Sequence, residues 1–245
     1  DILLASDLSN EEVIKVKAAS DNLMGIYIDE GSKRSYPFKN VISEILGYTG
    51  EVTADDLKNL AYVNATDIVG RTGLEREYDE LLAGTDGEMA WEVDRFEKKL
   101  SDKGLILTSP VAGDDLYLSI DMDVQNELYS ALENGIKKAK ATGGAGVIED
   151  VTTGEIIAMV TYPSYDDNLF IGGISYSDYS KLLNDTSNPL MNRAIAAQVP
   201  PGSTFKTLVA TGALDSGAIT TKTYYTSTSN YTFSNGASFQ EYHNH

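Results

Sequence analysis

The sequence predicts an α+β protein of two domains, and three observations support this class. Helix-capping signals followed by helical spacing recur along the chain, beginning with Ser9 and Glu12. Short β-branched or alternating runs lie between the helices, as at 156–160. Apolar residues make up 42% and charged residues 23% of the 245 residues, the balance of a globular protein with a substantial core. A change of pattern near residue 115 predicts domains over 1–115 and 116–245.

Short helices and strands alternate through the first predicted domain. Ser9 with Glu12, and later Thr72 with Glu75, form capping-box strings ahead of apolar runs. Beyond Thr72, apolar residues recur at helical spacing and predict one continuous helical face that ends at Gly84. The predicted helices span 9–22, 41–46, 53–60 and 72–83, and the predicted strands span 25–29, 89–93 and 105–107.

The second predicted domain begins with a long helix. Asp121 can cap this helix, and apolar residues then recur at every fourth position from Val124 to Ile136. Thr152-Thr153-Gly154 between two β-branched runs predicts a hairpin. The other predicted elements are a helix over 175–183, a helix that follows Pro200-Pro201-Gly202 and ends at Gly217, and strands or loops over 220–245.

Composition excludes several classes of function. The chain has 37 acidic and 19 basic residues, a net charge of −18, and such a chain repels the phosphates of nucleic acid. Cysteine is absent, so there are no disulfides, thiolate metal sites or cysteine nucleophiles. The two histidines, His243 and His245, form a weak metal site at best and argue against a histidine-based triad. No apolar run within these residues is long enough to span a membrane.

Ser203 and Lys206 are the candidate catalytic residues. Their spacing of three puts both side chains on one face of the helix predicted after Pro200-Pro201-Gly202. A serine hydroxyl becomes a nucleophile when a neighbouring base takes its proton, and a lysine can do so when desolvation lowers its pKa. The start of a helix also offers backbone N–H groups that can stabilise an oxyanion. The arrangement suits acyl transfer.

Isolated Ser-x-x-Lys strings also arise by chance, and most of them are solvated helix positions. Two other pairs have ordinary structural interpretations. Arg71 and Glu75 are spaced to form a minor surface ion pair on a helix. Asp166 and Asp167 are adjacent, so we expect a loop or capping role and no catalytic carboxylate pair.

A wider pattern distinguishes the Ser203 string from chance matches. Its parts, in chain order, are Arg34 with Tyr36-Pro37, Leu46-Gly47-Tyr48-Thr49-Gly50, Gly70-Arg71-Thr72-Gly73-Leu74-Glu75, Leu118-Ser119-Ile120-Asp121, Thr153-Gly154-Glu155-Ile156-Ile157-Ala158-Met159, Tyr162-Pro163-Ser164-Tyr165-Asp166, Asn192-Arg193-Ala194 and Pro200-Pro201-Gly202-Ser203-Thr204-Phe205-Lys206. In this order they resemble class B penicillin-binding proteins, in which the Ser-x-x-Lys string marks the nucleophile.

The resemblance implies both a fold and an activity. The fold would be an elongated pedestal (dimerisation) domain over 1–115, followed by the first part of a β-lactamase-like transpeptidase α/β sandwich over 116–245. Ser203 would be acylated by the D-Ala-D-Ala end of a peptidoglycan stem peptide, with Lys206 as proton acceptor. The amine of a neighbouring stem would then take the acyl group. β-Lactam antibiotics would acylate the same serine.

The resemblance also implies a location and partners. The protein would act at the extracytoplasmic face of the bacterial cell membrane, anchored by an N-terminal segment absent from this chain. Its pedestal would contact a membrane glycosyltransferase, and the protein would use neither a metal nor an organic cofactor.

The chain departs from the family in two motifs. Downstream of Ser203 it contains no Ser-x-Asn, and it contains no Lys-[Ser/Thr]-Gly at all. Ser20-Asp21-Asn22 matches the first of these motifs but lies far upstream, so we interpret it as a chance match. We therefore expect a piece of a longer protein that cannot complete the reaction alone. The alternatives are a β-lactamase or D,D-carboxypeptidase, and a non-catalytic β-lactam sensor or cell-wall assembly scaffold.

Overall fold

The computed structural model describes residues 4–5, 8–19, 23, 26, 28, 31, 33–95, 100, 104–226 and 230–240. The chain forms two compact units, Asp1–Ala197 and Gln198–His245, and each is described by itself. Helices are combined with antiparallel strand pairs, which confirms the α+β class.

Short elements make up most of the first unit. Its α-helices are α1 (Asn10–Ala19), α2 (Ser43–Leu46), α3 (Asp56–Asn59), α4 (Gly73–Glu77), α5 (Asp79–Ala83), α6 (Met122–Ala139), α7 (Tyr176–Asn184) and α8 (Arg193–Ala196). Its 3₁₀ turns include η2 (Lys39–Val41) and η3 (Asp167–Phe170). Its strands pair antiparallel as β1 (Thr49–Glu51) with β2 (Ile68–Gly70), β3 (Glu88–Ala90) with β4 (Leu105–Thr108), and β5 (Gly144–Glu149) with β6 (Ile156–Tyr162).

The second unit holds fewer elements. They are the 3₁₀ turn η4 (Gly202–Thr204), the helix α9 (Phe205–Asp215), and the antiparallel pair β7 (Asn230–Thr232) and β8 (Ser238–Gln240). Gly217 has a φ of 71°, and α9 ends just before it, as the sequence predicts.

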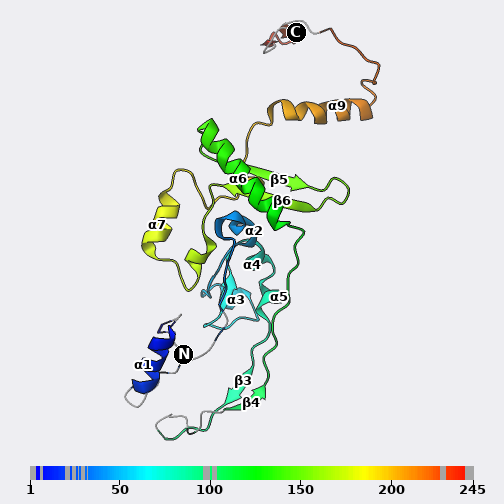
Figure 1. The fold of residues 1–245 in the computed structure, drawn as a ribbon. Coiled ribbons are helices and arrows are strands. Elements are labelled where there is room, and N and C mark those ends of the chain that lie inside the picture. Colours follow the sequence, from blue (N-terminus) through cyan, green and yellow to red (C-terminus); the bar gives the residue numbers. More distant parts are fainter. Residues whose placement is uncertain are drawn as a thin grey trace. The chain divides into compact units, whose positions relative to one another are not determined.

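One part of the core of the first unit lies where α6 packs on the β5–β6 hairpin (Figure 1). Ala158 and Val160 of β6 and Ile136 of α6 are buried there. A Cβ atom on Gly146 would lie 3.1 Å from Leu128 Cδ1, so glycine lets the helix approach β5 closely. This packing explains why α6 is the longest helix that the structure describes.

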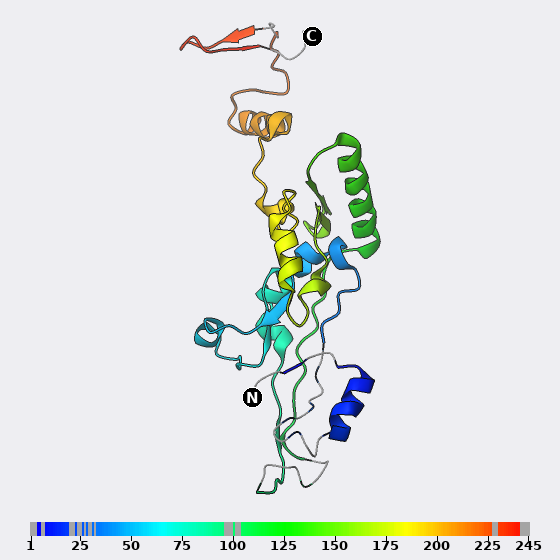
Figure 2. The ribbon, with the colours of Figure 1, turned by 90° about the vertical axis from the view of Figure 1, so that its left-hand side faces the viewer.

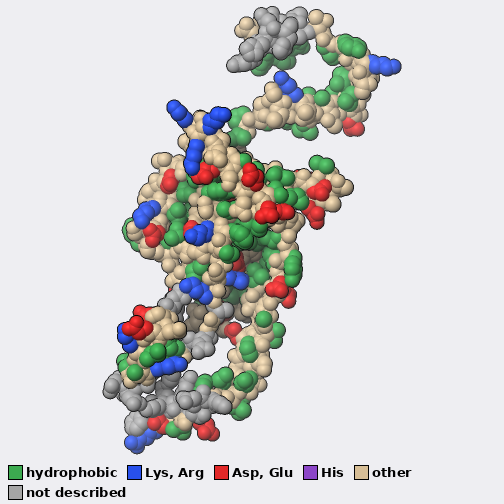
Figure 3. Space-filling view, in the orientation of Figure 1, with side chains coloured by type: hydrophobic (Ala, Val, Ile, Leu, Met, Phe, Trp, Pro, Cys, Tyr) green, Lys and Arg blue, Asp and Glu red, His purple; other side chains and the backbone are tan. Residues whose placement is uncertain are grey.

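The ends of α6 are stabilised by charge and capping. Asp121 Oδ1 accepts hydrogen bonds from the backbone N–H groups of Asp123 and Val124, at 2.9 and 3.1 Å, as the predicted cap requires. Lysines gather at the opposite end, where Figure 3 shows a group of blue side chains. They complement the negative end of the helix dipole.

Gln125 of α6 is fully buried, with 0% of its surface exposed, and its amide has several backbone partners. Nε2 donates to Val41 O at 2.7 Å and to Met159 O at 2.8 Å, and Oε1 accepts from Met159 N at 2.8 Å. One side chain therefore joins α6, β6 and the segment before α2.

Further hydrogen bonds join the segment around α2 to the later part of the chain. Tyr36 N donates to Asn168 Oδ1 at 3.0 Å, and Asn168 Nδ2 donates to Tyr36 O at 2.7 Å. The hydroxyls of Ser43 and Ser164 lie 2.7 Å apart. In Figures 1 and 2, α2 accordingly lies beside the β5–β6 hairpin and the start of α6. The first predicted domain is thus interlocked with residues 116–197 of the second within one compact unit.

Glycines allow α2 and α4 to meet. Gly47 ends α2 with a φ of 77°, and a Cβ there would lie 1.9 Å from Thr72 O. Gly73 has a φ of 59°, and its Cβ would lie 2.6 Å from Ile45 O. Only glycine fits this contact without moving the backbone.

Most predicted caps are confirmed. The hydroxyl of Ser9 donates to Glu12 Oε2 at 2.7 Å, and Glu12 N donates back to Ser9 Oγ at 3.3 Å, so α1 has the predicted capping box. Ser175 caps α7, because its side chain accepts from Asp178 N at 3.0 Å. The hairpin around Thr152-Thr153-Gly154 is also confirmed.

The helix predicted over 72–83 is wrong in two respects. Thr72 makes no side-chain cap, and the reciprocal bond of a capping box is also lost, because the Glu75 carboxylate that would accept from the Thr72 N–H is bonded to residues far away in sequence. The helix also breaks at Tyr78, whose φ of −112° and ψ of 19° separate α4 from α5.

Other boundaries differ less. The helix predicted over 53–60 shortens to α3. The strand predicted over 89–93, whose alternating apolar residues indicated one buried face, corresponds to β3, which is exposed. The strand predicted at 25–29 falls mostly outside the described residues, as do Ser20-Asp21-Asn22, His243 and His245. Among the helices that the structure describes, none is both long and apolar enough to cross a membrane.

Candidate active site

Ser203 lies in η4, the 3₁₀ turn that leads directly into α9. Gly202, just before it, has a φ of 55°, in the left-handed region that glycine adopts readily. The Thr204 hydroxyl donates to Pro201 O at 2.5 Å, and the backbone N–H of Phe205 donates to Gly202 O. These local bonds close the turn, so Ser203 stands at the start of a helix as the sequence predicts.

Lys206 follows in the first turn of α9, three residues after Ser203. Continuous helical backbone between the two residues places them on one face. Both are exposed, and within the described part of the chain neither the Ser203 hydroxyl nor the Lys206 ammonium group has a hydrogen-bond partner. The structure therefore brings the pair to one helix turn without joining them by a hydrogen bond.

Asp166 and Asp167 face different surroundings. Asp166 Oδ1 accepts from Asn168 N at 3.0 Å and caps η3, which confirms the capping role. Asp167 has 0% of its surface exposed, and neither carboxylate oxygen has a hydrogen-bond partner among the residues with described positions. Burial, helped by the negative charges of Asp166 and Glu75, raises the pKa of Asp167 to about 7. The adjacent acids do not form a catalytic pair.

Replacing Asp167 with asparagine should stabilise the protein above neutral pH. The folded-state pKa of about 7 lies above the usual value of 3.8, so Asp167 makes wild-type stability fall as the pH rises from about 4 through 7. Asp167→Asn should remove this loss of stability. The loss amounts to a few kcal/mol at pH 8, since each unit of pKa shift corresponds to about 1.4 kcal/mol. Thermal unfolding between pH 4 and pH 8 measures it.

The control for this prediction is Asp178→Asn. Asp178 accepts from Ser175 and Lys181, which lower its pKa, so its loss should slightly destabilise the protein at pH 8. A pH dependence of unfolding that is the same in Asp167→Asn as in the wild type would contradict a buried, titrating Asp167.

The expected Arg71–Glu75 pair is wrong. Arg71 Nη1 lies 2.7 Å from Asp56 Oδ2, and Glu75 Oε2 lies 2.9 Å from Arg34 Nη2. Glu75 Oε1 also accepts from the Tyr36 hydroxyl at 3.2 Å. Both ion pairs join segments distant in sequence.

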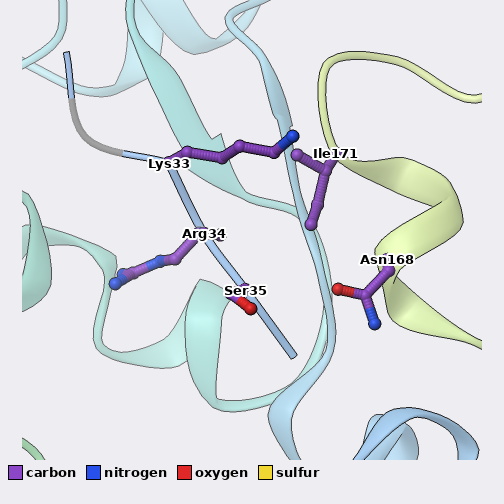
Figure 4. A pocket seen from close by; sticks show the side chains of 5 residues that line it. All are labelled: Lys33, Arg34, Ser35, Asn168 and Ile171. Carbon is purple, nitrogen blue, oxygen red and sulfur yellow. The ribbon is translucent and has the colours of Figure 1, made fainter. Parts of the chain in front are cut away.

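A hollow in the first unit is lined by residues from the segment 33–35 and from η3 and its end (Figure 4). Arg34 extends away from Asn168 in this view. Its Nη2 lies 2.9 Å from Glu75 Oε2. Asn168 is engaged with the Tyr36 backbone, so the polar groups serve to fasten the segment. The hollow includes neither Ser203 nor Lys206. Its lining residues are Lys33, Arg34, Ser35, Asn168 and Ile171.

Sequence reasoning missed the structural roles of Gln125 and Asn192. The wider sequence pattern contains Asn192, but no spacing rule identifies a side chain whose partner lies 148 residues away. The same holds for Gln125, whose partners lie 34 and 84 residues away.

Two family models match the chain. The penicillin-binding protein dimerisation domain matches residues 1–118, and the penicillin-binding protein transpeptidase domain matches residues 144–245. The chain belongs to the penicillin-binding proteins. The family resemblance drawn from the sequence pattern is thereby confirmed.

Named relatives and solved structures agree with this family. The peptidoglycan D,D-transpeptidase MrdA of Escherichia coli is 33% identical over 228 residues, which cover 91% of this chain and 35% of the relative. Penicillin-binding protein 3 of Bacillus subtilis is 32% identical, over 84% of this chain and 29% of its own length. The chain thus spans about a third of the length of these curated relatives.

Among solved structures, the chain resembles penicillin-binding protein PBP2 of Helicobacter pylori in its complex with MreC. The TM-score is 0.79 at 30% identity, over 98% of this chain and 43% of that one. PBP2 of Pseudomonas aeruginosa in complex with WCK 5153 gives a TM-score of 0.70 at 33% identity, over 86% and 41% of the two chains. The fold of this chain is therefore similar to the matched part of PBP2, which is less than half of that protein.

Proposed function

We propose that the protein is a serine-type peptidoglycan D,D-transpeptidase that cross-links the cell wall and binds penicillin. One observation carries the proposal: Ser203 and Lys206 stand one turn apart at the start of α9, inside the segment that the transpeptidase model matches. This is the position at which a serine nucleophile and its base are needed for acyl transfer.

The proposed reaction has two acyl transfers. Lys206, in its neutral form, takes the proton of Ser203, and Oγ attacks the carbonyl carbon between the two D-Ala residues of a stem peptide. The peptide bond breaks, the terminal D-Ala leaves with a proton, and Ser203 holds the acyl group as an ester. The amine of a second stem then attacks the ester, forms the new peptide bond and returns the proton to Ser203.

We place the boundary between the pedestal and the transpeptidase domain near residues 115 and 116. The stretch that follows β4 and leads to the cap of α6 forms no helix or strand beyond one isolated bridge between Thr85 and Val111, which supports this division. In this proposal the protein acts on the extracytoplasmic face of the bacterial membrane, with stem peptides and β-lactams as ligands. Its pedestal contacts a membrane glycosyltransferase.

Acylation further requires Ser-x-Asn and Lys-[Ser/Thr]-Gly motifs, neither of which follows Ser203 within these 245 residues. In this family the Lys-[Ser/Thr]-Gly motif lies on the strand that lines the active-site cleft. We therefore propose that the 245 residues alone do not complete the reaction.

Mass spectrometry after exposure to benzylpenicillin tests the proposal. The full-length protein should gain one penicillin adduct, on the peptide that contains Ser203, and the 245-residue chain should gain none. An adduct on another serine would contradict the assignment, and an adduct on the short chain would contradict the need for further motifs. Release of D-Ala from a stem peptide, with cross-linking, separates a transpeptidase from a sensor. If the full-length protein gains no adduct, the scaffold alternative is favoured.

A further inference from the structure

Two segments that are distant in sequence meet inside the first unit, and we call their contact the α2–η3 junction. Residues 36–48 include α2, and residues 164–171 include η3. Phe170 stacks on Tyr48 with ring centroids 3.7 Å apart, and the Asn168 amide makes two hydrogen bonds with backbone groups of the first segment. The junction therefore joins a segment that the dimerisation model matches to one that the transpeptidase model matches.

Asp167 lies within this junction, in η3. Its surface is 0% exposed, and neither carboxylate oxygen has a hydrogen-bond partner among the residues that the structure describes. Asn168 and Phe170, which follow it, both contact the other side of the junction. Tyr165, which precedes it, donates from its hydroxyl to Ser43 O at 3.4 Å. Exposing Asp167 to water therefore disturbs contacts on both of its flanks.

Glu44 is the second acid of the junction and lies on the opposite side, in α2. Its Oε1 is buried and has no hydrogen-bond partner within the described residues, since the Asn192 amide donates to the Glu44 backbone carbonyl, at 3.0 Å. Burial raises the pKa of Glu44 to about 7, although the positive charge of Arg193 opposes the shift. The pKa of Asp167 is raised to the same value, so both carboxyl groups are mostly protonated below neutral pH and ionised above it.

The charges around Asp167 favour its protonated form. Glu75 of α4 and the neighbouring Asp166 are negative and help burial to raise its pKa. The cations Arg34 and Lys39 pair with these two carboxylates, at 2.9 and 3.9 Å. Their positive charges are therefore directed to Glu75 and Asp166 and not to the buried acid.

Three tyrosines of the junction stay neutral between pH 6 and pH 8, because burial raises the pKa of the hydroxyls of Tyr36, Tyr48 and Tyr165. The charges of Glu44 and Asp167 both add to the shift at Tyr165, so the two acids act on one ring. The groups of the junction that change charge near neutral pH are thus the two buried carboxyl groups.

We propose that the α2–η3 junction is a pH-dependent switch, which is closed while Glu44 and Asp167 are protonated and opens locally when they ionise. An ionised carboxylate that lacks hydrogen bonds is costly inside a protein, and water stabilises it once the junction opens. A rise in pH through 7 therefore weakens the contact between the dimerisation segment and the start of the transpeptidase segment. The switch does not depend on the acylation of Ser203.

Hydrogen exchange of the full-length protein at pH 6 and pH 8 tests the switch. After correction for the intrinsic pH dependence of exchange, protection over 36–48 and 164–171 should fall about 100-fold in the wild type, because each acid whose pKa drops from about 7 to about 4 on opening contributes about tenfold. Asp167→Asn and Glu44→Gln should each reduce the fall to about tenfold. The double variant should show almost no fall.

Two comparisons separate local opening from other effects. Asp150→Asn removes an exposed acid of the turn between β5 and β6, whose pKa is lowered by hydrogen bonds from Thr152, so it should leave the wild-type fall unchanged. Protection over 128–136 of α6 reports unfolding of the whole unit and should exceed that of the junction at pH 8. The readout is the change of protection with pH, so a variant that is merely less stable still tests the switch.

The outcomes are distinguishable. Equal protection of α6 and of the junction at pH 8 would overturn a separate opening. The switch would also be overturned if protection of the wild-type junction did not change with pH, or if the wild-type fall persisted in the double variant. A protein that shows the pH response but gains no penicillin adduct would contradict the proposed function alone.

Discussion

Replacing Lys206 with alanine should slow the acylation of Ser203 by benzylpenicillin by about 10²–10⁴-fold, the usual contribution of a positioned general base. The pair lies on one helical turn, and Lys206 is the basic side chain that the helix itself brings to Ser203. The second-order rate constant of acylation in the full-length protein measures this effect, with Ser203→Ala as the variant that shows no acylation.

Lys222→Ala is the matched control for the loss of a positive charge. Lys222 is also exposed and is likewise followed by threonine, but no serine stands three residues before it. The Lys222→Ala variant should be acylated at the wild-type rate. If Lys206→Ala is acylated at the wild-type rate, Lys206 is not the base. If Lys222→Ala loses as much of the acylation rate as Lys206→Ala does, the effect comes from net charge.

Replacing Gln125 with leucine should cost about 3–5 kcal/mol of stability, the largest loss that we expect from one residue of this fold. Leucine has a similar volume but leaves Val41 O, Met159 O and Met159 N buried without their partner. Each unsatisfied buried group costs about 1–3 kcal/mol. Thermal unfolding gives the total loss, and hydrogen exchange over 156–162 should show faster exchange where β6 loses its bond.

Asn126→Leu provides the comparison for Gln125. Asn126 is the next residue of α6, and its amide donates to Met122 O within the helix while remaining exposed. A surface change of this kind costs about 0.5 kcal/mol or less. If both variants lost the same stability, the loss would come from leucine on α6 in general and not from the junction at Gln125.

Local chemistry explains which parts of the fold could be predicted. Ser9 with Glu12 forms its capping box because both partners lie within one turn and nothing else competes for them. Thr72 with Glu75 has the same spacing and fails, because Arg34 and Tyr36 take the Glu75 carboxylate. A sequence pattern can predict interactions within one helical turn. It cannot predict bonds such as those of Glu75, whose partners are distant in sequence.

The candidate site also has features that local sequence predicts and features that depend on distant partners. The turn at Ser203 and the helix at Lys206 follow from Gly202 and from a spacing of three, so their backbone was predictable. The roles of Gln125 and Asn192 depend on carbonyl groups of the segment that precedes and includes α2. Those partners become neighbours only after the fold has formed.

The interlocking around α2 restricts how this chain can be divided or recombined. The two family models leave residues 119–143 between them, which would be the natural place to join parts from different proteins. Yet positions 36, 43 and 44 are bonded to positions 168, 164 and 192 on the far side of that join, and position 41 is bonded to position 125 within it. Only Ser43 with Ser164 joins two side chains; the other bonds end on backbone groups of positions 36, 41 and 44, which an exchanged segment also supplies. A chimera therefore has to place that backbone against Gln125, Asn168 and Asn192, so the part of the chain that can be exchanged intact is larger than either matched domain.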